Sequence, residues 1–318
     1  MKKFLIYITG FLLLVIVLSE VTIRFFDLAG KTMLEKEIDN NAMLKPGEKG
    51  FFKRGGLKEI NSYYSINKQG YNSIIDYDTL DKQNINIALI GDSYVQGMHT
   101  DVRHSIGRQL EELFDRNVIV HEYGRDGANI VDYALTFKKY IQSKPYDFTF
   151  ILVTDKDVRL KKPSTIGRGD RVSKENIFRS LYDNFHLLRY LNINHGLMVH
   201  FNKLINNGPE SIDRIHGKNS DKDDLIKETY LNKVNNDALG MISSKVIFLY
   251  EEDRLSHYFI ESFNFQFKKV IHLKHPINHG LDKHWNINGR YNCAKTMADY
   301  INEHKNRTKK INENKNLN

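Results

Sequence analysis

The stretch that decides the fold runs from Asn84 to Gly97 and reads Asn-Ile-Asn-Ile-Ala-Leu-Ile-Gly-Asp-Ser-Tyr-Val-Gln-Gly. Its first half is an apolar, isoleucine-rich run of strand length, and the run stops abruptly at Gly91-Asp92-Ser93. Ser93 is therefore predicted at the carboxyl end of a core strand, where open α/β sheets place their chemistry. An ordinary strand-ending turn prefers the same three residue types, so the triplet needs further support.

Helix and strand patterns alternate after Ser93. Strand, helix, strand at this spacing implies right-handed crossovers and a sheet covered on both faces. The predicted helices are 105–114, 130–141 and 290–304, and the predicted strands are 84–90, 117–121, 148–153, 245–250 and 269–273. We therefore predict an α/β fold: a three-layer α/β/α sandwich with a mostly parallel, flavodoxin-like sheet.

The alternation of strand and helix patterns is interrupted between residues 156 and 243. We interpret this segment as a helical insertion in the same domain. It carries predicted helices at 177–205 and 224–242, with a loop-like segment at 206–223. Leu181, Phe185, Leu188 and Leu191 recur at helical spacing and are most simply core residues. The alternative is that they line an acyl or membrane-facing groove.

Composition limits the class of protein. A chain of 318 residues with 41% hydrophobic and 11% aromatic residues can fill a sizeable core. Half of the formal charge of +8 lies in residues 305–318, which hold five Lys or Arg and one Glu and which we predict to be a basic disordered tail; no nucleic-acid motif is visible. The single cysteine, Cys293, excludes an intrachain disulfide framework and a zinc ribbon.

The amino terminus has the pattern of a membrane anchor. Lys2 and Lys3 precede an uncharged apolar run from Phe4 to Ser19. Glu20 and Arg24 follow, four apart on one helical face, where they can pair or snorkel. We predict residues 1–26 as a cytoplasmic stub and single transmembrane helix in the cytoplasmic membrane, with the remainder exported. A cleavable signal peptide is the alternative, although no Ala-x-Ala-like site follows Ser19.

A linker is predicted at 27–60 and the catalytic domain at 61–304. Two further segments could complete a site with Ser93. Glycines in Glu122-Tyr-Gly124-Arg-Asp-Gly127 would let backbone N–H groups approach a developing oxyanion. Asp282-Lys-His284-Trp, just before the last predicted helix, offers a base and a carboxylate to orient it, which acyl transfer through serine requires.

These segments, in this order, resemble the blocks of the SGNH or GDSL esterases and acyltransferases. The resemblance implies that Ser93 is the nucleophile, Gly127 an oxyanion donor, Asp282 the orienting carboxylate and His284 the base. The Asp-x-His-Trp form of the last segment is similar to that of alginate-type polysaccharide O-acetylation proteins. The Asn67-Lys-Gln-Gly-Tyr segment is similar to one found in membrane-linked family members. The chain departs from the family where an oxyanion Asn is expected, because Lys156 stands there.

We therefore expect a membrane-anchored serine esterase or O-acyltransferase acting on acyl esters of envelope polysaccharide or lipid. The alternative is a catalytically weak relative that binds glycan. We expect no cofactor and no nucleic-acid partner. A metal site among His272, His275, His279 and His284 is disfavoured, since Pro276 and Gly280 break any helix that would align them.

Overall fold

The structure is a computed structural model. It describes residues 1–31, 33–39, 41–78, 80–154, 157, 182–197, 200, 246–251, 267–270, 279–280 and 284–315. Contacts divide the chain into two compact units. The first comprises Met1–Leu34, Gly50–Ser62 and Ser173–Asn219, and the second comprises Glu35–Lys49, Tyr63–Val172 and Ser220–Asn318. The predicted domain bounds stay predictions.

The second unit is organised around a parallel sheet, whose five described strands lie in the order β6-β5-β7-β8-β9. The strands are β5 (Ile85–Gly91), β6 (Val118–Gly124), β7 (Phe148–Val153), β8 (Val246–Glu251) and β9 (Phe267–Val270). Along the chain this order is second, first, third, fourth, fifth, which is the flavodoxin-like order. The chain moves to one side of β5 to form β6 and to the other side to form β7, so β5 lies at the switch point of the sheet.

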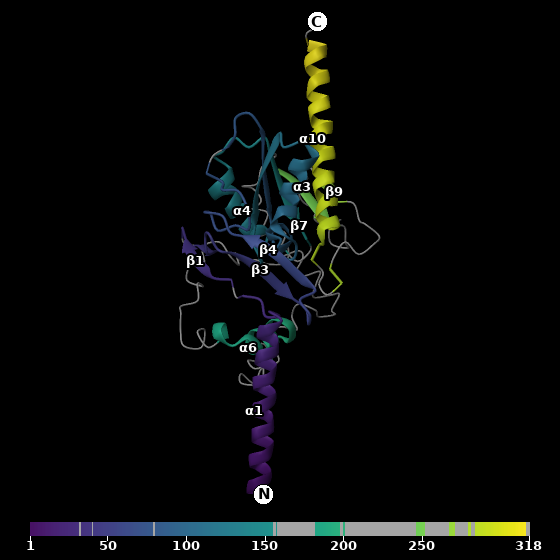
Figure 1. Ribbon diagram of the computed structural model, residues 1–318. Helices are drawn as coiled ribbons and strands as arrows, with labels where there is room; N and C mark the ends of the chain where they lie inside the picture. Colours follow the sequence, from purple (N-terminus) through teal and green to yellow (C-terminus); the bar gives the residue numbers. More distant parts are fainter. Residues whose placement is uncertain are drawn as a thin grey trace, which may run out of the picture. The chain divides into compact units, whose positions relative to one another are not determined.

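Side chains of successive strand residues enter opposite layers, as the period of a β-strand requires. Ile87 and Leu89 pack in a core with α3 (Ile106–Leu113) and α10 (Ile287–Lys315). Ala88 and Ile90 pack in a second core with α4 (Ile130–Thr136). Figure 1 shows α4 on one side of the sheet and the α3–α10 pair on the other. The predicted three-layer α/β fold is confirmed.

The predicted strand at 117–121 is too short, because β6 continues to Gly124. Glu122 is polar, but its buried carboxylate accepts hydrogen bonds from Ser105 Oγ at 2.6 Å and from the Gly107 backbone N–H at 2.8 Å. These donors lie at the start of α3 and satisfy a charge that would otherwise end a buried strand. The helix predicted at 130–141 is present as α4 followed by a wider turn, η2 (Phe137–Ile141).

The predicted disordered tail is also corrected, since α10 continues through residues 305–315. In its first turns, four apolar side chains are buried: Cys293, Ala294, Met297 and Ile301. A helix nucleated by such packing adds one hydrogen bond for each further residue, and the tail contains four Lys and one Arg, which are good helix formers. The predicted helix 224–242 and the loop 206–223 lie outside the described residues.

Residues predicted as a linker contain regular structure. Strand β1 (Glu35–Ile38) pairs antiparallel with β2 (Asn41–Leu44), and β3 (Lys49–Arg54) pairs with β4 (Ile60–Ser65). Met43 of β2 is buried in the core that also contains α4.

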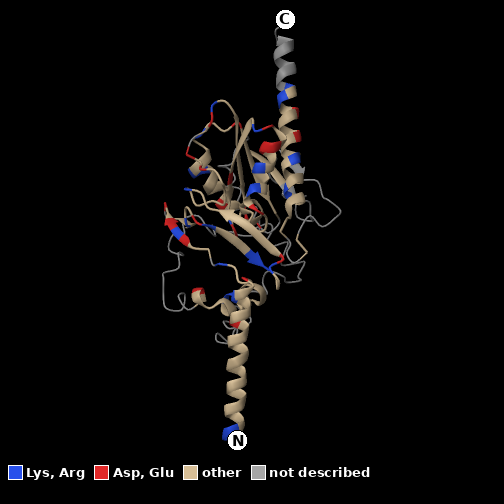
Figure 2. Ribbon diagram, in the orientation of Figure 1, with Lys and Arg blue, Asp and Glu red and all other residues tan. Residues whose placement is uncertain are grey.

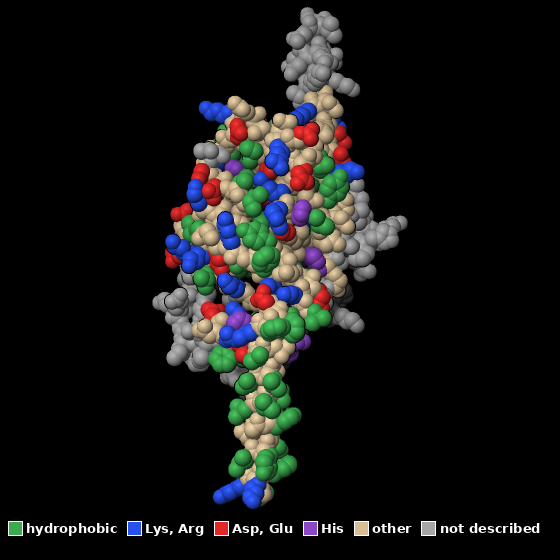
Figure 3. Space-filling model, viewed as in Figure 1, with side chains coloured by type: hydrophobic (Ala, Val, Ile, Leu, Met, Phe, Trp, Pro, Cys, Tyr) green, Lys and Arg blue, Asp and Glu red, His purple; other side chains and the backbone are tan. Residues whose placement is uncertain are grey.

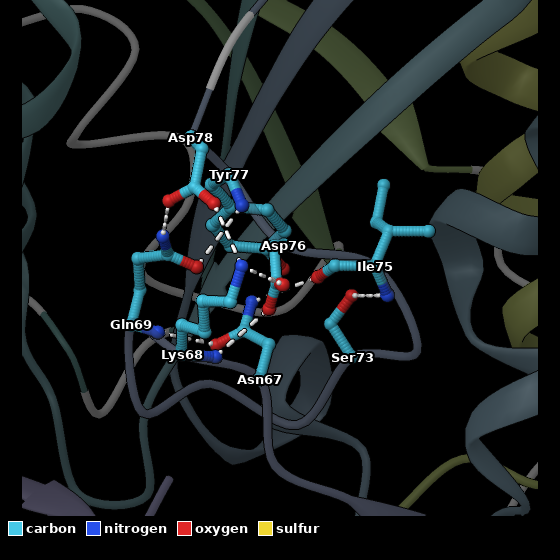
Figure 4. Close-up of polar contacts among 8 residues, drawn as sticks. All are labelled: Asn67, Lys68, Gln69, Ser73, Ile75, Asp76, Tyr77 and Asp78. Carbon is cyan, nitrogen blue, oxygen red and sulfur yellow. Dashed lines mark hydrogen bonds and ion pairs between the residues drawn. The ribbon is translucent and has the colours of Figure 1, made fainter. Parts of the chain in front are cut away.

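The segment before β5 is held by a local hydrogen-bond network (Figure 4). The Asn67 side-chain oxygen accepts hydrogen bonds from the backbone N–H groups of Gln69 and Tyr71, and its amide nitrogen donates to the Ile75 carbonyl. Tyr71 is thereby turned into the core, where its ring packs against Tyr77 and Tyr123. The Asn-x-x-Gly-aromatic pattern thus marks a side-chain-stabilised turn.

The first unit contains α1 (Lys2–Phe25), which is the one helix among the described residues long and apolar enough to cross a membrane. The expected pair near its end forms, with Arg24 Nε 2.5 Å from Glu20 Oε1. The helix predicted at 177–205 is interrupted at Phe185, whose backbone is extended, and α6 runs only from His186 to His195. Phe185 and Leu188 are 45% and 39% exposed, so the expectation that they are core residues is wrong.

Candidate active site

Ser93 lies where the sequence predicts, on the turn that follows β5. It is the first residue of the short helix α2 (Ser93–Gln96). The Asp92 side chain caps this helix by accepting a hydrogen bond from the Tyr94 N–H at 2.9 Å. Val95 is buried in the core below. The serine hydroxyl is therefore half-exposed on a backbone that is fixed on both sides.

His284 reaches Ser93 from the far end of the chain. Its Nε2 is 2.8 Å from Ser93 Oγ, which is hydrogen-bond distance. Thr100 Oγ1 donates a hydrogen bond to the Trp285 carbonyl and so ties this loop to the segment after α2. The Asn286 side chain then accepts hydrogen bonds from two backbone N–H groups at the start of α10. The histidine thus lies three residues before the start of α10, whose first turn is capped.

The His284 ring contacts two other rings, those of His99 and Tyr94. The His99 ring stacks on it, with 3.9 Å between ring centroids and planes within 8° of parallel. The Tyr94 ring lies 5.2 Å from the His284 ring and 5.0 Å from that of Trp285. Trp285 and His99 are buried. These contacts restrict rotation of the imidazole and favour the orientation that points Nε2 at the serine.

Gly127 lies on the loop that leaves β6. The register pairs Gly91 with Gly124, so this loop begins beside the turn that carries Ser93. Arg125 to Ala128 form a four-residue turn closed by a 3.1 Å bond from the Ala128 N–H to the Arg125 carbonyl. Gly127 is its third residue, with φ of +69°, a conformation that favours glycine. Among the described residues, apart from its two chain neighbours, no atom lies within 4 Å of where a Cβ would stand.

Gly124 is needed for a different reason, which is close packing. A Cβ at this residue would lie 2.1 Å from the Gln96 nitrogen and 2.4 Å from the Val95 carbonyl carbon. Only a residue without a side chain lets the end of β6 approach α2 this closely. Gly124 therefore sets the position of the helix that begins with Ser93.

A pair of buried carboxyl groups lies under the serine turn. Asp157 accepts hydrogen bonds from the Thr154 N–H at 2.7 Å and from its hydroxyl at 3.0 Å. Burial raises the pKa of Asp92 well above its ordinary value, and the neighbouring Asp157 carboxylate raises it further. Burial likewise raises the pKa of Tyr133, with Asp157 adding to the effect. These groups connect the cap of α2 to the loop that follows β7.

A second buried charge lies behind α2. The Arg290 side chain of α10 packs against Gly97, and none of its three guanidinium nitrogens has a hydrogen-bond partner among the described residues. Burial lowers the pKa of Arg290 to about 10, and the buried Glu122 carboxylate acts in the opposite direction. The long-range attraction between Arg290 and Glu122 therefore partly offsets the cost of burying both charges.

Of the residues predicted for the site, Ser93 and His284 meet, and Gly127 lies on the adjoining loop. Asp282 and Lys156 lie outside the described residues, as do His272 and His275. Sequence reasoning missed His99, which stacks on the candidate base. Its only signal is its place, two residues after the glycine that ends α2, followed by the buried Thr100.

This geometry can support nucleophilic chemistry. A serine hydroxyl in hydrogen-bond contact with an imidazole can lose its proton to that imidazole as it attacks an electrophilic carbon. The exposed backbone of the Gly127 turn opens beside it, where an N–H group could stabilise negative charge. Which imidazole nitrogen carries the proton depends on the tautomer.

Comparison with known proteins gives distant structural likeness only. No protein-family model matches the sequence, and no curated protein matches it. Among solved structures, a member of the lipolytic protein G-D-S-L family from Veillonella parvula is 12% identical, with a TM-score of 0.34, and the match covers 67% of this chain and 96% of that one.

Two further similar structures are esterases by description. A putative arylesterase from Agrobacterium tumefaciens is 12% identical, with a TM-score of 0.34, and the match covers 69% of this chain and 98% of that one. An acetyl xylan esterase from Butyrivibrio proteoclasticus is 10% identical, with a TM-score of 0.38, covering 72% of this chain and 66% of that one.

Proposed function

We propose that the protein is a serine esterase or O-acyltransferase of the SGNH or GDSL type. The observation that carries this proposal is the 2.8 Å approach of His284 Nε2 to Ser93 Oγ at the carboxyl end of β5. The switch point of a parallel α/β sheet is where such folds bind their substrates. A serine and a histidine brought together there from opposite ends of the chain form the core of an acyl-transfer site.

The reaction follows from this pair. Ser93 Oγ attacks the carbonyl carbon of an ester while His284 Nε2 takes the hydroxyl proton. The tetrahedral intermediate collapses, the bond to the leaving alkoxide breaks, and His284 returns the proton to that oxygen. An acyl-serine remains. Water or a sugar hydroxyl then attacks the acyl group, with His284 again accepting and returning one proton, and Ser93 is regenerated.

Asp282 orients the imidazole and stabilises its charged form in this proposal. The backbone N–H groups of Ser93 and Gly127 hold the oxyanion in this proposal. Lys156 occupies the place where the family has an Asn, and its ammonium group would act as the third donor. Loss of one oxyanion donor costs about 2.7 to 4 kcal/mol of transition-state stabilisation.

The location follows from α1. With Lys2 and Lys3 before its apolar run, α1 would anchor the chain in the cytoplasmic membrane and leave the catalytic unit on the exported side. There the accessible esters are those of envelope polysaccharide and lipid.

Hydrolysis of p-nitrophenyl acetate by the full chain in detergent micelles tests the catalytic pair. We expect Ser93→Ala and His284→Ala each to lower kcat by about a thousandfold or more. Ser143→Ala and His104→Ala replace the same residue types at exposed positions and should retain the rate. Wild-type rates in the two site variants would refute the proposal.

The rival function is glycan binding by an inactive relative, which the missing Asn favours. A serine-reactive fluorophosphonate separates the two, because only an activated Ser93 is labelled. Product analysis with an added oligosaccharide acceptor then separates hydrolase from transferase, since an acylated sugar appears only if a hydroxyl group other than that of water accepts the acyl group.

A further inference from the structure

Apolar side chains are exposed where α1 ends in the first unit. Phe25, Phe26 and Leu57 are 80%, 56% and 77% exposed, and Phe185 and Leu188 are 45% and 39% exposed. We call these five residues the apolar cluster. Figure 3 shows hydrophobic side chains along the visible length of α1 and around its carboxyl end. Exposed apolar groups gathered in this way mark an interaction surface.

The position of α6 in this region is fixed by the charged last turns of α1. Helix α6 has no side-chain cap of its own. Instead, the Glu20 carboxylate accepts hydrogen bonds from the backbone N–H groups of His186 at 3.1 Å and Leu187 at 2.7 Å. Arg24 pairs with Glu20 and donates to the Asn184 carbonyl at 2.6 Å. Glu20 therefore caps α6 from another helix.

The turn between β3 and β4 is tied to the same two helices. Lys58 Nζ donates to the Phe26 carbonyl at 3.1 Å. On the other side, the Gly55 N–H donates to Asn194 Oδ1 at 2.8 Å, and the Tyr190 hydroxyl donates to the Gly56 carbonyl at 3.1 Å. The end of α1, this turn and α6 therefore form one hydrogen-bonded assembly, and each contributes to the apolar cluster.

The length of α1 sets the position of this assembly relative to the hydrocarbon core of a bilayer. From Lys2 to Glu20 a helix rises about 27 Å, close to the ~30 Å thickness of a hydrocarbon core. In the ribbon of Figure 2, the positions of charged residues are coloured at both ends of α1 and none between them. Glu20 is neutralised by Arg24, so it places no uncompensated charge near lipid. The apolar cluster therefore begins at the level where the hydrocarbon core would end.

We propose that the apolar cluster is a lipid-contact surface, with α6 lying in the headgroup region of the bilayer that α1 enters. The partner is a phospholipid bilayer, because the cluster continues the apolar surface of α1, whose span is unburied and has a mean hydropathy of 2.4. Phenylalanine and leucine side chains exposed at the start of a short helix suit the boundary between headgroups and acyl chains. This inference rests on the proposed membrane anchor.

Nitroxide labelling of the full chain tests this surface. The single cysteine, Cys293, is buried, so a Cys293→Ala background leaves an introduced thiol as the only reactive one. Labels at Phe185→Cys and Leu188→Cys are compared with a lipid reference at Leu12→Cys and a water reference at Asn302→Cys, both exposed. The protein is reconstituted in vesicles of phosphatidylethanolamine with a minority of phosphatidylglycerol, and collisions with oxygen and with a water-soluble nickel chelate are measured.

We expect labels at 185 and 188 to collide with oxygen more, and with the nickel chelate severalfold less, than the Asn302 label. Glu20→Ala, which removes the cap of α6, should return the 185 label to the water-accessible value, while Glu59→Ala in the neighbouring turn should not. Nickel accessibility equal to that of Asn302, with Leu12 still in lipid, would overturn the inference and leave the anchor intact. Labels shielded from both agents would indicate a protein partner and overturn it too, and a water-accessible Leu12 would instead refute the anchor.

Discussion

Gly124→Ala is the sharpest test of how the fold positions the serine. The added Cβ would meet the backbone of α2 at 2.1 Å from the Gln96 nitrogen and 2.4 Å from the Val95 carbonyl carbon. Non-bonded heavy atoms are in ordinary contact at ~3.5 Å, so β6 or α2 must move by roughly 1 to 1.5 Å. Neither contact can be relieved by rotating a side chain, because both atoms belong to the main chain.

Overpacking a core typically costs 1 to 3 kcal/mol, and main-chain contacts put this substitution at about 3 kcal/mol. For a domain of about 150 to 250 residues, each kcal/mol lowers Tm by roughly 2 to 4 °C, so we expect a fall of about 6 to 12 °C. Because the displaced helix begins with Ser93, a 1 Å misplacement can also lower the rate by about a hundredfold.

Thermal unfolding of the full chain in detergent, followed by circular dichroism, measures the first effect. Ester hydrolysis at a temperature where the variant is fully folded measures the second. Gly127→Ala is the matched control for the Tm measurement: its Cβ meets no atom of the described residues within 4 Å, and the substitution costs the strain of a positive φ, about 1 kcal/mol. Equal Tm values for the Gly124 variant and the wild type, with an unchanged rate, would refute the close approach of β6 to α2.

Three further predictions concern His99, His121 and Asn67. His99→Ala removes the ring stacked on His284 and should lower kcat about threefold to tenfold with little change in KM. His99→Phe keeps a stacked ring and should keep most of the rate. Kinetics of the alanine variant equal to those of the wild type would show that the stacked ring does not position His284. Burial lowers the pKa of His121 to about 4 from 6.5, so between these values the unfolded chain binds a proton that the folded chain does not. The free energy of unfolding should therefore fall by up to about 3 kcal/mol as pH falls through this window, and His121→Phe should flatten the fall in urea titrations. Asn67→Ala should lower the same free energy by about 1 to 3 kcal/mol, because one buried and one half-buried backbone N–H group lose their acceptor. Lys68→Ala, which breaks only exposed ion pairs, should change it by less than ~1 kcal/mol.

Local pattern was sufficient to predict the frame of the second unit. β7 has the predicted bounds, β5 and β8 agree within a residue, and α3 lies within its predicted range with Ser105 as its cap. These elements can be recognised in the sequence because a buried parallel strand is apolar along its length, and the apolar residues of an amphipathic helix recur every three to four positions. The serine at the break after β5 is predictable for the same reason.

Elements whose polar groups are satisfied from elsewhere were not predictable. β6 continues through Glu122 because donors from the start of α3 meet its carboxylate. α6 begins at His186 because Glu20, far away in the sequence, caps it. A single sequence contains no local sign of either partner.

The sequence by itself determined that this chain is an α/β protein with an apolar amino-terminal helix and a serine at the end of a core strand. The sequence also suggested His284 as the partner of that serine, but only the tertiary structure decided that the two side chains approach to 2.8 Å, that His99 stacks on the imidazole, and that Gly124 holds α2 in place. The physical reason is the range of the interactions. Backbone periodicity and capping act within a few residues, whereas an imidazole contacts a hydroxyl 191 residues away only after the sheet has brought its strand ends together.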